Sequence, residues 1–166
     1  MNTTQMTPGT VLLAALMLTL PGLTQADPLQ DLTLHDPWVR EVPPVADRSA
    51  AYVRIENSGS ADRTLLAAES ELFERVELHE SREGDDGTMR MIHLDEIALP
   101  AGDTTALEPG GYHIMLIDRI GEPLSEADGD EVPIRLHFDN GENARVEATV
   151  RKHAPDNGHE GHDMDH

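Results

Sequence analysis

Histidine and methionine side chains lie close together at two places in the middle of this sequence. His113 and Met115 are two residues apart, and Met89, Met91 and His93 form a second group. Thioether sulfur is a soft, uncharged ligand that prefers Cu(I), and a neutral imidazole strengthens such a site without adding charge. Methionine also fills gaps in hydrophobic cores, so core packing is the alternative explanation. The repeated pairing of methionine with histidine favours a copper site.

The segments that carry these residues have the pattern of β-strands, in which residues two apart point to the same face. His113 and Met115 therefore share a face, and so do the members of the second group. Ile92 and Leu94 alternate with that group and are expected on an apolar opposite face. His93 itself is interpreted as a surface histidine.

The turn-forming segment 83–87 is expected to close a hairpin ahead of the second group. A loop symmetric about Asp85 places His79 directly opposite Met91, with Cβ atoms about 5 Å apart, close enough to share one metal ion. A two-residue turn at Asp86-Gly87 would shift the register and separate this pair.

The whole body of the chain reads as all-β, because short alternating runs recur between residues that favour turns. Eight or nine strands of this kind indicate a β-sandwich or a Greek-key barrel. The expected strands are Leu32–Arg40, Ala50–Asn57, Arg63–Ala68, Arg75–Ser81, Met89–Ile97, Thr104–Leu107, Tyr112–Ile117, Val132–Phe138 and Arg145–Arg151.

Composition excludes several classes of function. The 166 residues contain no cysteine, which rules out disulfides, thiolate zinc sites, iron–sulfur clusters and blue-copper centres. The 32 acidic residues outnumber the 12 basic ones, for a net charge of −20. Such a charge disfavours nucleic acid and anionic membranes as partners and favours a monomer at low salt.

The first 26 residues are interpreted as a signal peptide. Val11–Leu20 is a ten-residue apolar run, too short to span a bilayer, and Pro21-Gly22 ends it. Small residues at Thr24 and Ala26 predict cleavage before Asp27, and hence export to the periplasm without membrane insertion of the mature chain.

The mature chain is expected to consist of one domain, residues 27–151, and a polar tail, residues 152–166. The tail cannot bury enough apolar surface to order itself. Its histidines and methionine predict a second metal site, for Cu(II); a solvated acidic tail is the alternative. The residues of this predicted site are His153, His159, His162, Met164 and His166.

The spacing of the ligand candidates resembles the H(M)x10Mx21HxM motif of the PCu(A)C family of periplasmic copper chaperones. His79 opens the motif, with Glu80 at its optional methionine position. Residues 81–90 form the first spacer, Met91 follows, residues 92–112 form the second, and His113-Ile114-Met115 closes it. The similarity extends over Leu34 to Val150, through segments such as Trp38-Val39-Arg40 and Pro109-Gly110-Gly111-Tyr112.

This resemblance implies a cupredoxin-like β-barrel that binds Cu(I) through His79, Met91, His113 and Met115, with Met89 as an alternative or auxiliary ligand. It also implies delivery of copper to cytochrome c oxidase, at the CuA centre of subunit II or elsewhere, with help from a thioredoxin-like Sco-type protein. A copper buffer or resistance protein without a dedicated recipient is the alternative. An enzyme is not expected, because no acid–base pair or nucleophilic arrangement accompanies the ligands.

Overall fold

The computed structural model describes residues 29–155, which form ten strands and no helix. The strands are β1 (Leu32–Arg40), β2 (Arg48–Asn57), β3 (Arg63–Glu69), β4 (Phe73–Glu83), β5 (Met89–Leu94), β6 (Ile97–Leu99), β7 (Thr104–Leu107), β8 (Tyr112–Arg119), β9 (Glu131–Phe138) and β10 (Asn143–Arg151). Within this range, no helix long and apolar enough to cross a membrane is found. The predicted signal peptide lies outside the described residues.

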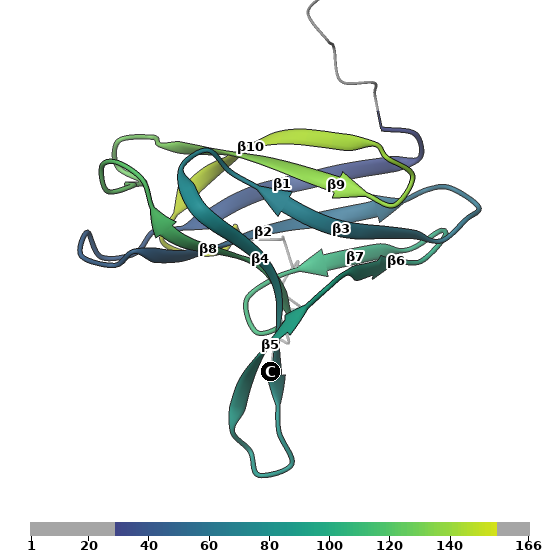
Figure 1. Ribbon diagram of the computed structural model, residues 1–166, viewed down its shortest axis with the longest axis horizontal. Helices are drawn as coiled ribbons and strands as arrows, with labels where there is room; N and C mark the ends of the chain where they lie inside the picture. The colour runs from purple at the N-terminus through teal and green to yellow at the C-terminus, as the bar shows by residue number, and fades with distance from the viewer. Residues whose placement is uncertain (1–28, 156–166) are drawn as a thin grey trace, which may run out of the picture.

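All ten strands belong to one sheet, in the order β5-β4-β8-β7-β2-β1-β10-β9-β3-β6, with a further pairing between β8 and β2. The sheet folds back on itself, so that β3 and β9 lie over β4 and β8 (Figure 1). The first and last strands are neighbours in its middle: β1 runs parallel to β10, with Trp38 opposite Thr149.

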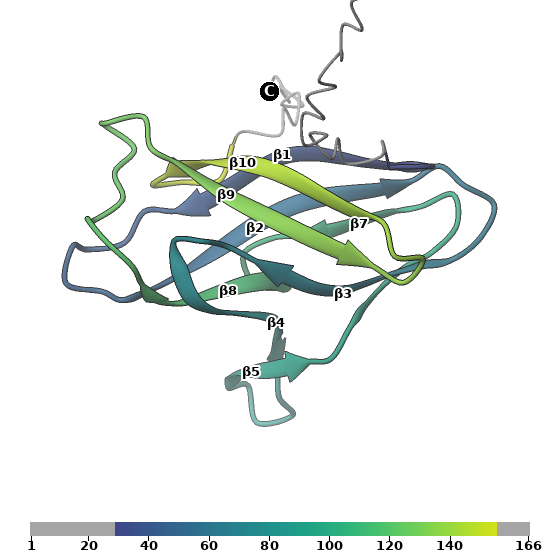
Figure 2. The ribbon, with the colours of Figure 1, turned by 45° about the horizontal axis from the view of Figure 1, so that its top comes forward.

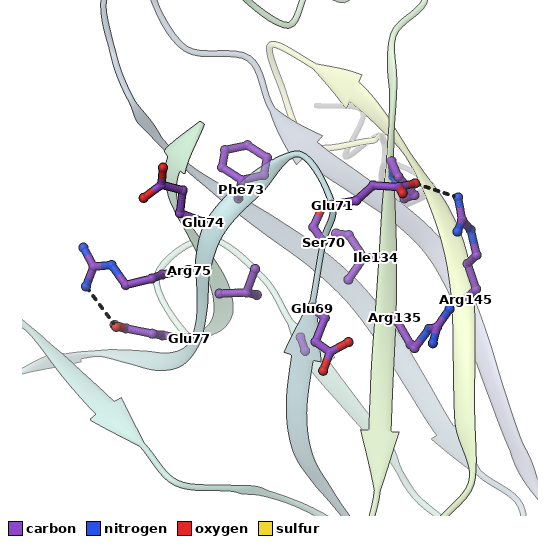
Figure 3. A pocket seen from close by; sticks show the side chains of 13 residues that line it. Glu69, Ser70, Glu71, Phe73, Glu74, Arg75, Glu77, Ile134, Arg135 and Arg145 are labelled. Carbon is purple, nitrogen blue, oxygen red and sulfur yellow. Dashed lines mark hydrogen bonds and ion pairs between the residues drawn. The ribbon is translucent and has the colours of Figure 1, made fainter. Parts of the chain in front are cut away.

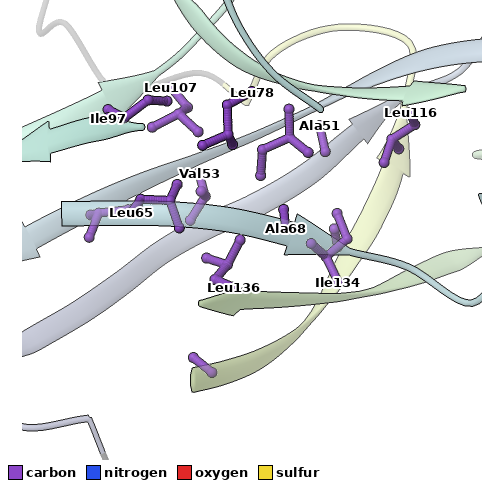
Figure 4. Packing of buried hydrophobic residues seen from close by; sticks show 14 of the residues in the cluster. Ala51, Val53, Leu65, Ala68, Leu78, Ile97, Leu107, Leu116, Ile134 and Leu136 are labelled. Atoms are coloured by element: carbon purple, nitrogen blue, oxygen red, sulfur yellow. The ribbon is translucent and has the colours of Figure 1, made fainter. Parts of the chain in front are cut away.

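The hydrophobic core lies between the two layers of this folded sheet. Leu65 on β3 and Leu136 on β9 are fully buried, as are Leu107 on β7 and Leu116 on β8. Figure 4 shows these side chains meeting from the two layers. Aliphatic side chains dominate the core, as expected for a chain in which aromatic residues are only 3% of the composition.

The predicted all-β, cupredoxin-like fold is confirmed, and the predicted strands all lie at or within a few residues of observed ones. One prediction of an element was wrong: Met89–Ile97 is not a single strand. It divides at Asp95 and Glu96 into β5, which pairs with β4, and β6, which pairs with β3. The two parts bond to strands at opposite ends of the sheet order, so the chain has to leave one layer and enter the other between them.

The β4–β5 hairpin protrudes from the rest of the domain (Figure 2). Its register differs from the prediction: His79 lies opposite His93, and Met91 lies opposite Ser81. The pairing is symmetric about Asp86, not Asp85, because Gly84 donates its N–H to the Thr88 carbonyl at 2.8 Å across the loop. The expected apolar face of β5 is also wrong at Ile92, which is exposed because the hairpin extends beyond the core.

Candidate metal centre

Three histidines form a row across neighbouring strands on one face of the sheet. His79 on β4 lies opposite His93 on β5 on one side and opposite His113 on β8 on the other. The ring centroid of His79 lies 5.4 Å from that of His93 and 5.7 Å from that of His113. The central strand therefore places His79 within reach of ligands from both neighbours.

The two motif methionines flank this row. Met91 is two residues before His93 on β5, and Met115 is two residues after His113 on β8, so both point to the histidine face. Met91, His113 and Met115 line one cavity of about 330 Å³. Met89 is 60% exposed and lies nearer the hairpin tip, outside the lining. The structure thus places Met91, His113 and Met115 around one cavity that Met89 does not line, with His79 next to His113 but outside the lining.

His113 is held in the tautomer that a metal ligand needs. It is 4% exposed, and its Nδ1–H donates to the Gly111 carbonyl at 3.1 Å, which leaves the Nε2 lone pair free. The same carbonyl accepts the Ser81 N–H at 3.0 Å, so β4 fixes its position. Burial lowers the pKa of His113, and the nearby His79 lowers it further against the effect of the Gly111 hydrogen bond. Neutral imidazole is the form that binds metal.

His79 is oriented by a neighbouring carboxylate. Its Nε2–H donates to Glu77 Oε2 at 2.8 Å, since a carboxylate can only accept. Its Nδ1 is buried, and no residue of the described chain forms a hydrogen bond with it. The hydrogen bond from His79, assisted by the charges of His79, His93 and Arg75 and opposed by burial, lowers the pKa of the Glu77 carboxyl. Glu77 therefore stays ionised and leaves His79 with a free Nδ1 lone pair.

Glu77 and His93 are potential metal ligands beside the cavity that the sequence reasoning missed. With His79, they offer three ligand atoms that all lie within 4.8 Å of one another. Two signals were available: Glu77 is two residues before His79 on the same strand, and His93 shares a face with Met91. The interpretation of His93 as a surface residue is correct in exposure, since 58% of its side chain is exposed, but it overlooks this contact.

An aromatic wall borders the cavity beside His113. Tyr52 lines the cavity, with its ring centroid 6.5 Å from that of His113, and Trp38 stacks on its other side at 4.5 Å. The Arg40 guanidinium lies 5.9 Å from the Tyr52 ring centroid. Ala50 lies opposite Met115 on β2, and its small side chain leaves the cavity open there.

Glu80, at the optional methionine position of the motif, plays no part on this face. Adjacent residues on a strand point to opposite faces, so Glu80 points away from the face of His79. Its carboxylate accepts a hydrogen bond from Arg82 at 2.6 Å.

A second cavity, of about 660 Å³, lies between the β3–β4 turn and strands β9 and β10 (Figure 3). Charged side chains of both signs line it and pair with one another, as Glu71 does with Arg145 at 3.2 Å and Glu77 with Arg75 at 3.6 Å. Glu74 and Arg135 line it as well. Glu77 alone connects it to the histidine face.

The predicted tail site lies almost entirely outside the described residues. His153 is described and exposed, whereas the other four members of the predicted tail site are not described. Ala154 and Pro155 line a small cavity together with Trp38 and Pro109, and Pro109 also lines the cavity of His113.

Fold and site together define the class of protein: a cupredoxin-like β-domain with histidines and methionines gathered on one face of its sheet. A family model described as putative lipoprotein LpqE-like matches residues 32–150, and the chain belongs to this LpqE-like family. The putative lipoprotein Lxx21020 of Leifsonia xyli subsp. xyli is 29% identical over 131 residues, covering 79% of this chain and 74% of that protein.

Solved structures with the same fold are PCuAC domains and a related protein. The apo PCuAC domain from PmoF1 matches with a TM-score of 0.64 at 20% identity, over 75% of this chain and 96% of that domain. DR1885 from Deinococcus radiodurans matches in its apo form with a TM-score of 0.60 at 26% identity, over 91% of this chain and 97% of that protein. Its CuI form matches with a TM-score of 0.54 at 30% identity, over 78% and 82%. The predicted likeness to PCuAC domains is confirmed at the level of the fold.

Proposed function

We propose that this protein is a copper carrier that binds one Cu(I) ion through His79, Met91, His113 and Met115. The observation that carries the proposal is that these four residues, from three strands, share one face of the sheet. Three of them line one cavity, and His79 lies next to His113. Two free imidazole nitrogens and two thioethers form a neutral, soft ligand set that suits Cu(I).

The comparisons support the choice of metal. One of the similar structures is a copper-bound PCuAC domain from PmoF2, and another is DR1885 with Cu(I). A set filled by four protein ligands leaves no open position for a substrate. We therefore propose a carrier and not an enzyme.

We further propose that the carrier is exported and works in the periplasm, which the lipoprotein descriptions of its family and relative support. Its proposed recipient is cytochrome c oxidase, at the CuA centre of subunit II or another copper centre, with a Sco-type protein as a further partner. The support for these partners is the family resemblance of the motif.

The His-rich tail is proposed as a second site, for Cu(II). Its first residues line a small cavity with Pro109, which also lines the cavity of His113, and this supports a role in raising the copper concentration there. Replacing His153, His159, His162 and His166 by asparagine should lower the number of Cu(II) ions bound per chain. An unchanged number would contradict the tail site.

The test of the carrier is an anaerobic Cu(I) competition titration on the mature chain. His113→Ala should lower the Cu(I) affinity at least about tenfold, the effect of losing a defined part of a metal site. His137→Ala is the matched control: His137 faces Glu69 on the other layer, at 3.4 Å, and its loss should leave Cu(I) affinity unchanged. Equal Cu(I) affinities of the unchanged chain, His113→Ala and His137→Ala would contradict the proposal.

The alternative function is a copper buffer or resistance protein with the same site and no dedicated recipient. Deletion of the gene separates the two functions. Loss of cytochrome c oxidase activity that added copper restores supports delivery, whereas copper sensitivity with normal oxidase activity supports buffering.

A further inference from the structure

A second set of metal-binding atoms lies beside the proposed Cu(I) site and shares one residue with it. Glu77 Oε2 lies 2.8 Å from His79 Nε2 and 3.8 Å from His93 Nδ1, and all three ligand atoms fall within 4.8 Å of one another. Ligands held about 2 Å from one ion lie about 3 to 4 Å apart. The spacing therefore fits a single ion between the three side chains.

The chemistry of this set differs from that of the set around His113. It offers two imidazole nitrogens and one carboxylate oxygen, with no thioether. Nitrogen and oxygen ligands suit divalent first-row ions, among which Cu(II) binds most tightly, and the carboxylate charge offsets part of the charge of the ion. The neutral His/Met set suits the monovalent ion instead.

Solvent reaches the second set more easily than the first. His93 lies on the edge strand β5, with 58% of its side chain exposed, whereas His113 is buried. The chain carries a net charge of −20, which raises the concentration of cations at its surface.

His79 belongs to both sets through different nitrogens. Glu77 accepts its Nε2–H, so the lone pair is on Nδ1, which is buried and has no hydrogen-bond partner in residues 29–155. A neutral imidazole has one lone pair only. An ion bound at Nε2 takes the place of that proton, and the neutral ring then carries its proton on Nδ1, where it cannot bind a second ion.

We propose that Glu77, His79 and His93 form a binding site for Cu(II) that excludes Cu(I) from the neighbouring His/Met set by taking the lone pair of His79. The inference rests on the proposed function for the identity of the His/Met set as the Cu(I) site. It goes beyond that function in assigning the domain its own divalent site, independent of the tail.

The test uses the full mature chain in which His153, His159, His162 and His166 are replaced by asparagine, so that the tail does not contribute nitrogen ligands. Cu(II) is titrated against glycine as a competitor, and electron paramagnetic resonance reports the number of bound nitrogens. Cu(I) affinity is measured separately on the same variants under anaerobic conditions.

The variants are expected to separate the two sets. His93→Ala and Glu77→Gln should each weaken Cu(II) binding at least about tenfold, and His93→Ala should remove nitrogen coupling from the Cu(II) spectrum. His93→Ala should leave Cu(I) affinity unchanged. His113→Ala should do the reverse, lowering Cu(I) affinity and sparing Cu(II). His79→Ala should weaken both.

Two results would overturn the inference: Cu(II) affinity in His93→Ala equal to that of the background, or equal losses of Cu(II) affinity in His93→Ala and His113→Ala. His93 is an exposed residue, so its replacement does not threaten the fold. If the background protein fails to bind Cu(I), the proposed function is wrong, and the Cu(II) results still decide for or against the second site.

Discussion

Met91 and Met89 lie two residues apart on the same face of β5, but only Met91 lines the cavity of His113 and Met115. Met91→Leu removes the thioether and keeps a side chain of similar volume. We therefore expect it to lower Cu(I) affinity at least about tenfold without loss of stability, as a competition titration and thermal unfolding would measure.

Met89→Leu is the matched control for this prediction. It is the same substitution on the same exposed strand, and it should leave Cu(I) affinity unchanged. A larger loss of affinity in Met89→Leu than in Met91→Leu would assign the ligand to the other methionine and mean that the hairpin changes register when copper binds.

At the level of residues, the sequence predicted the site best where the spacing of two ligands along a strand decides whether they share a face. The alternation of His113 and Met115 was enough to place both on one face. The roles of Glu77 and His93 were not foreseeable in the same way, because glutamate and histidine are common on exposed strands. Their contact depends on the hairpin register, which is set by hydrogen bonds inside a five-residue loop.

At the level of elements, the turn that precedes β8 positions the buried ligand. Gly110 has a φ of 89°, in the left-handed region that side chains with a Cβ rarely adopt, and Gly111 after it presents the carbonyl that holds His113. A Cβ at Gly110 would meet nothing within 4 Å, so substitution strains the backbone without a clash.

Gly110→Ala is therefore expected to destabilise the fold by about 1 kcal/mol and to lower Cu(I) affinity as well, because the strain falls on the turn that orients His113. Gly102→Ala is the control: its φ is 72°, its Cβ would also meet nothing, and it lies in the turn between β6 and β7. Chemical denaturation should show similar losses of stability in both. Copper affinity that falls in neither variant, or equally in both, would contradict a role for the turn.

Strand positions were predictable because inward and outward residues alternate, as in β9, where every second residue is buried. The hairpin register and the break between β5 and β6 were not predictable on this basis. Alternation loses its meaning in β5, which projects beyond the core and exposes nearly all its side chains. The break between β5 and β6 has a related cause. The chain passes there from one layer to the other, and this change of layer depends on the assembled sheet and not on the local pattern of residues.

At the level of the whole molecule, one ion-pair cluster ties β3 to the β9–β10 turn. Arg63, whose side chain is 13% exposed, donates to Asp139 at 3.1 Å and to Glu142 at 3.2 Å. Burial acts to raise the pKa of Asp139, but the hydrogen bond and charge of Arg63, with backbone hydrogen bonds from Thr64 and Asn140, outweigh it. The pKa of Glu142 is lowered mainly by its hydrogen bonding with Asn140; burial opposes this, and the hydrogen bond and charge of Arg63 lower the pKa further.

Both carboxyls thus have a lower pKa in the folded chain than in the unfolded one. Their contribution to stability is present above their ordinary pKa values of 3.8 and 4.5 and is lost as the pH falls below them. Arg63→Met should lower the melting temperature at pH 7 and flatten its decline between about pH 5 and pH 3. Arg145→Met, on the more exposed pair with Glu147, should change both much less. A decline in Arg63→Met as steep as in the wild type would contradict this role of the cluster.

The net charge of −20 makes the folded chain repel itself. Salt screens this repulsion, because the Debye length falls from about 10 Å at 0.1 M to about 3 Å at 1 M. We expect the melting temperature to rise over this range of NaCl, despite the weakening of individual ion pairs. A fall would mean that the ion pairs outweigh the repulsion.

The parallel pairing of β1 with β10 brings the two ends of the domain together in the middle of its sheet. A polypeptide is synthesised from its N-terminus, so β1 emerges long before the strand beside which it must lie. About a hundred residues separate the two strands, and pairings this distant in sequence are slow to form. The sheet therefore closes late, and a nascent chain of this protein stays open until Arg151 has left the ribosome.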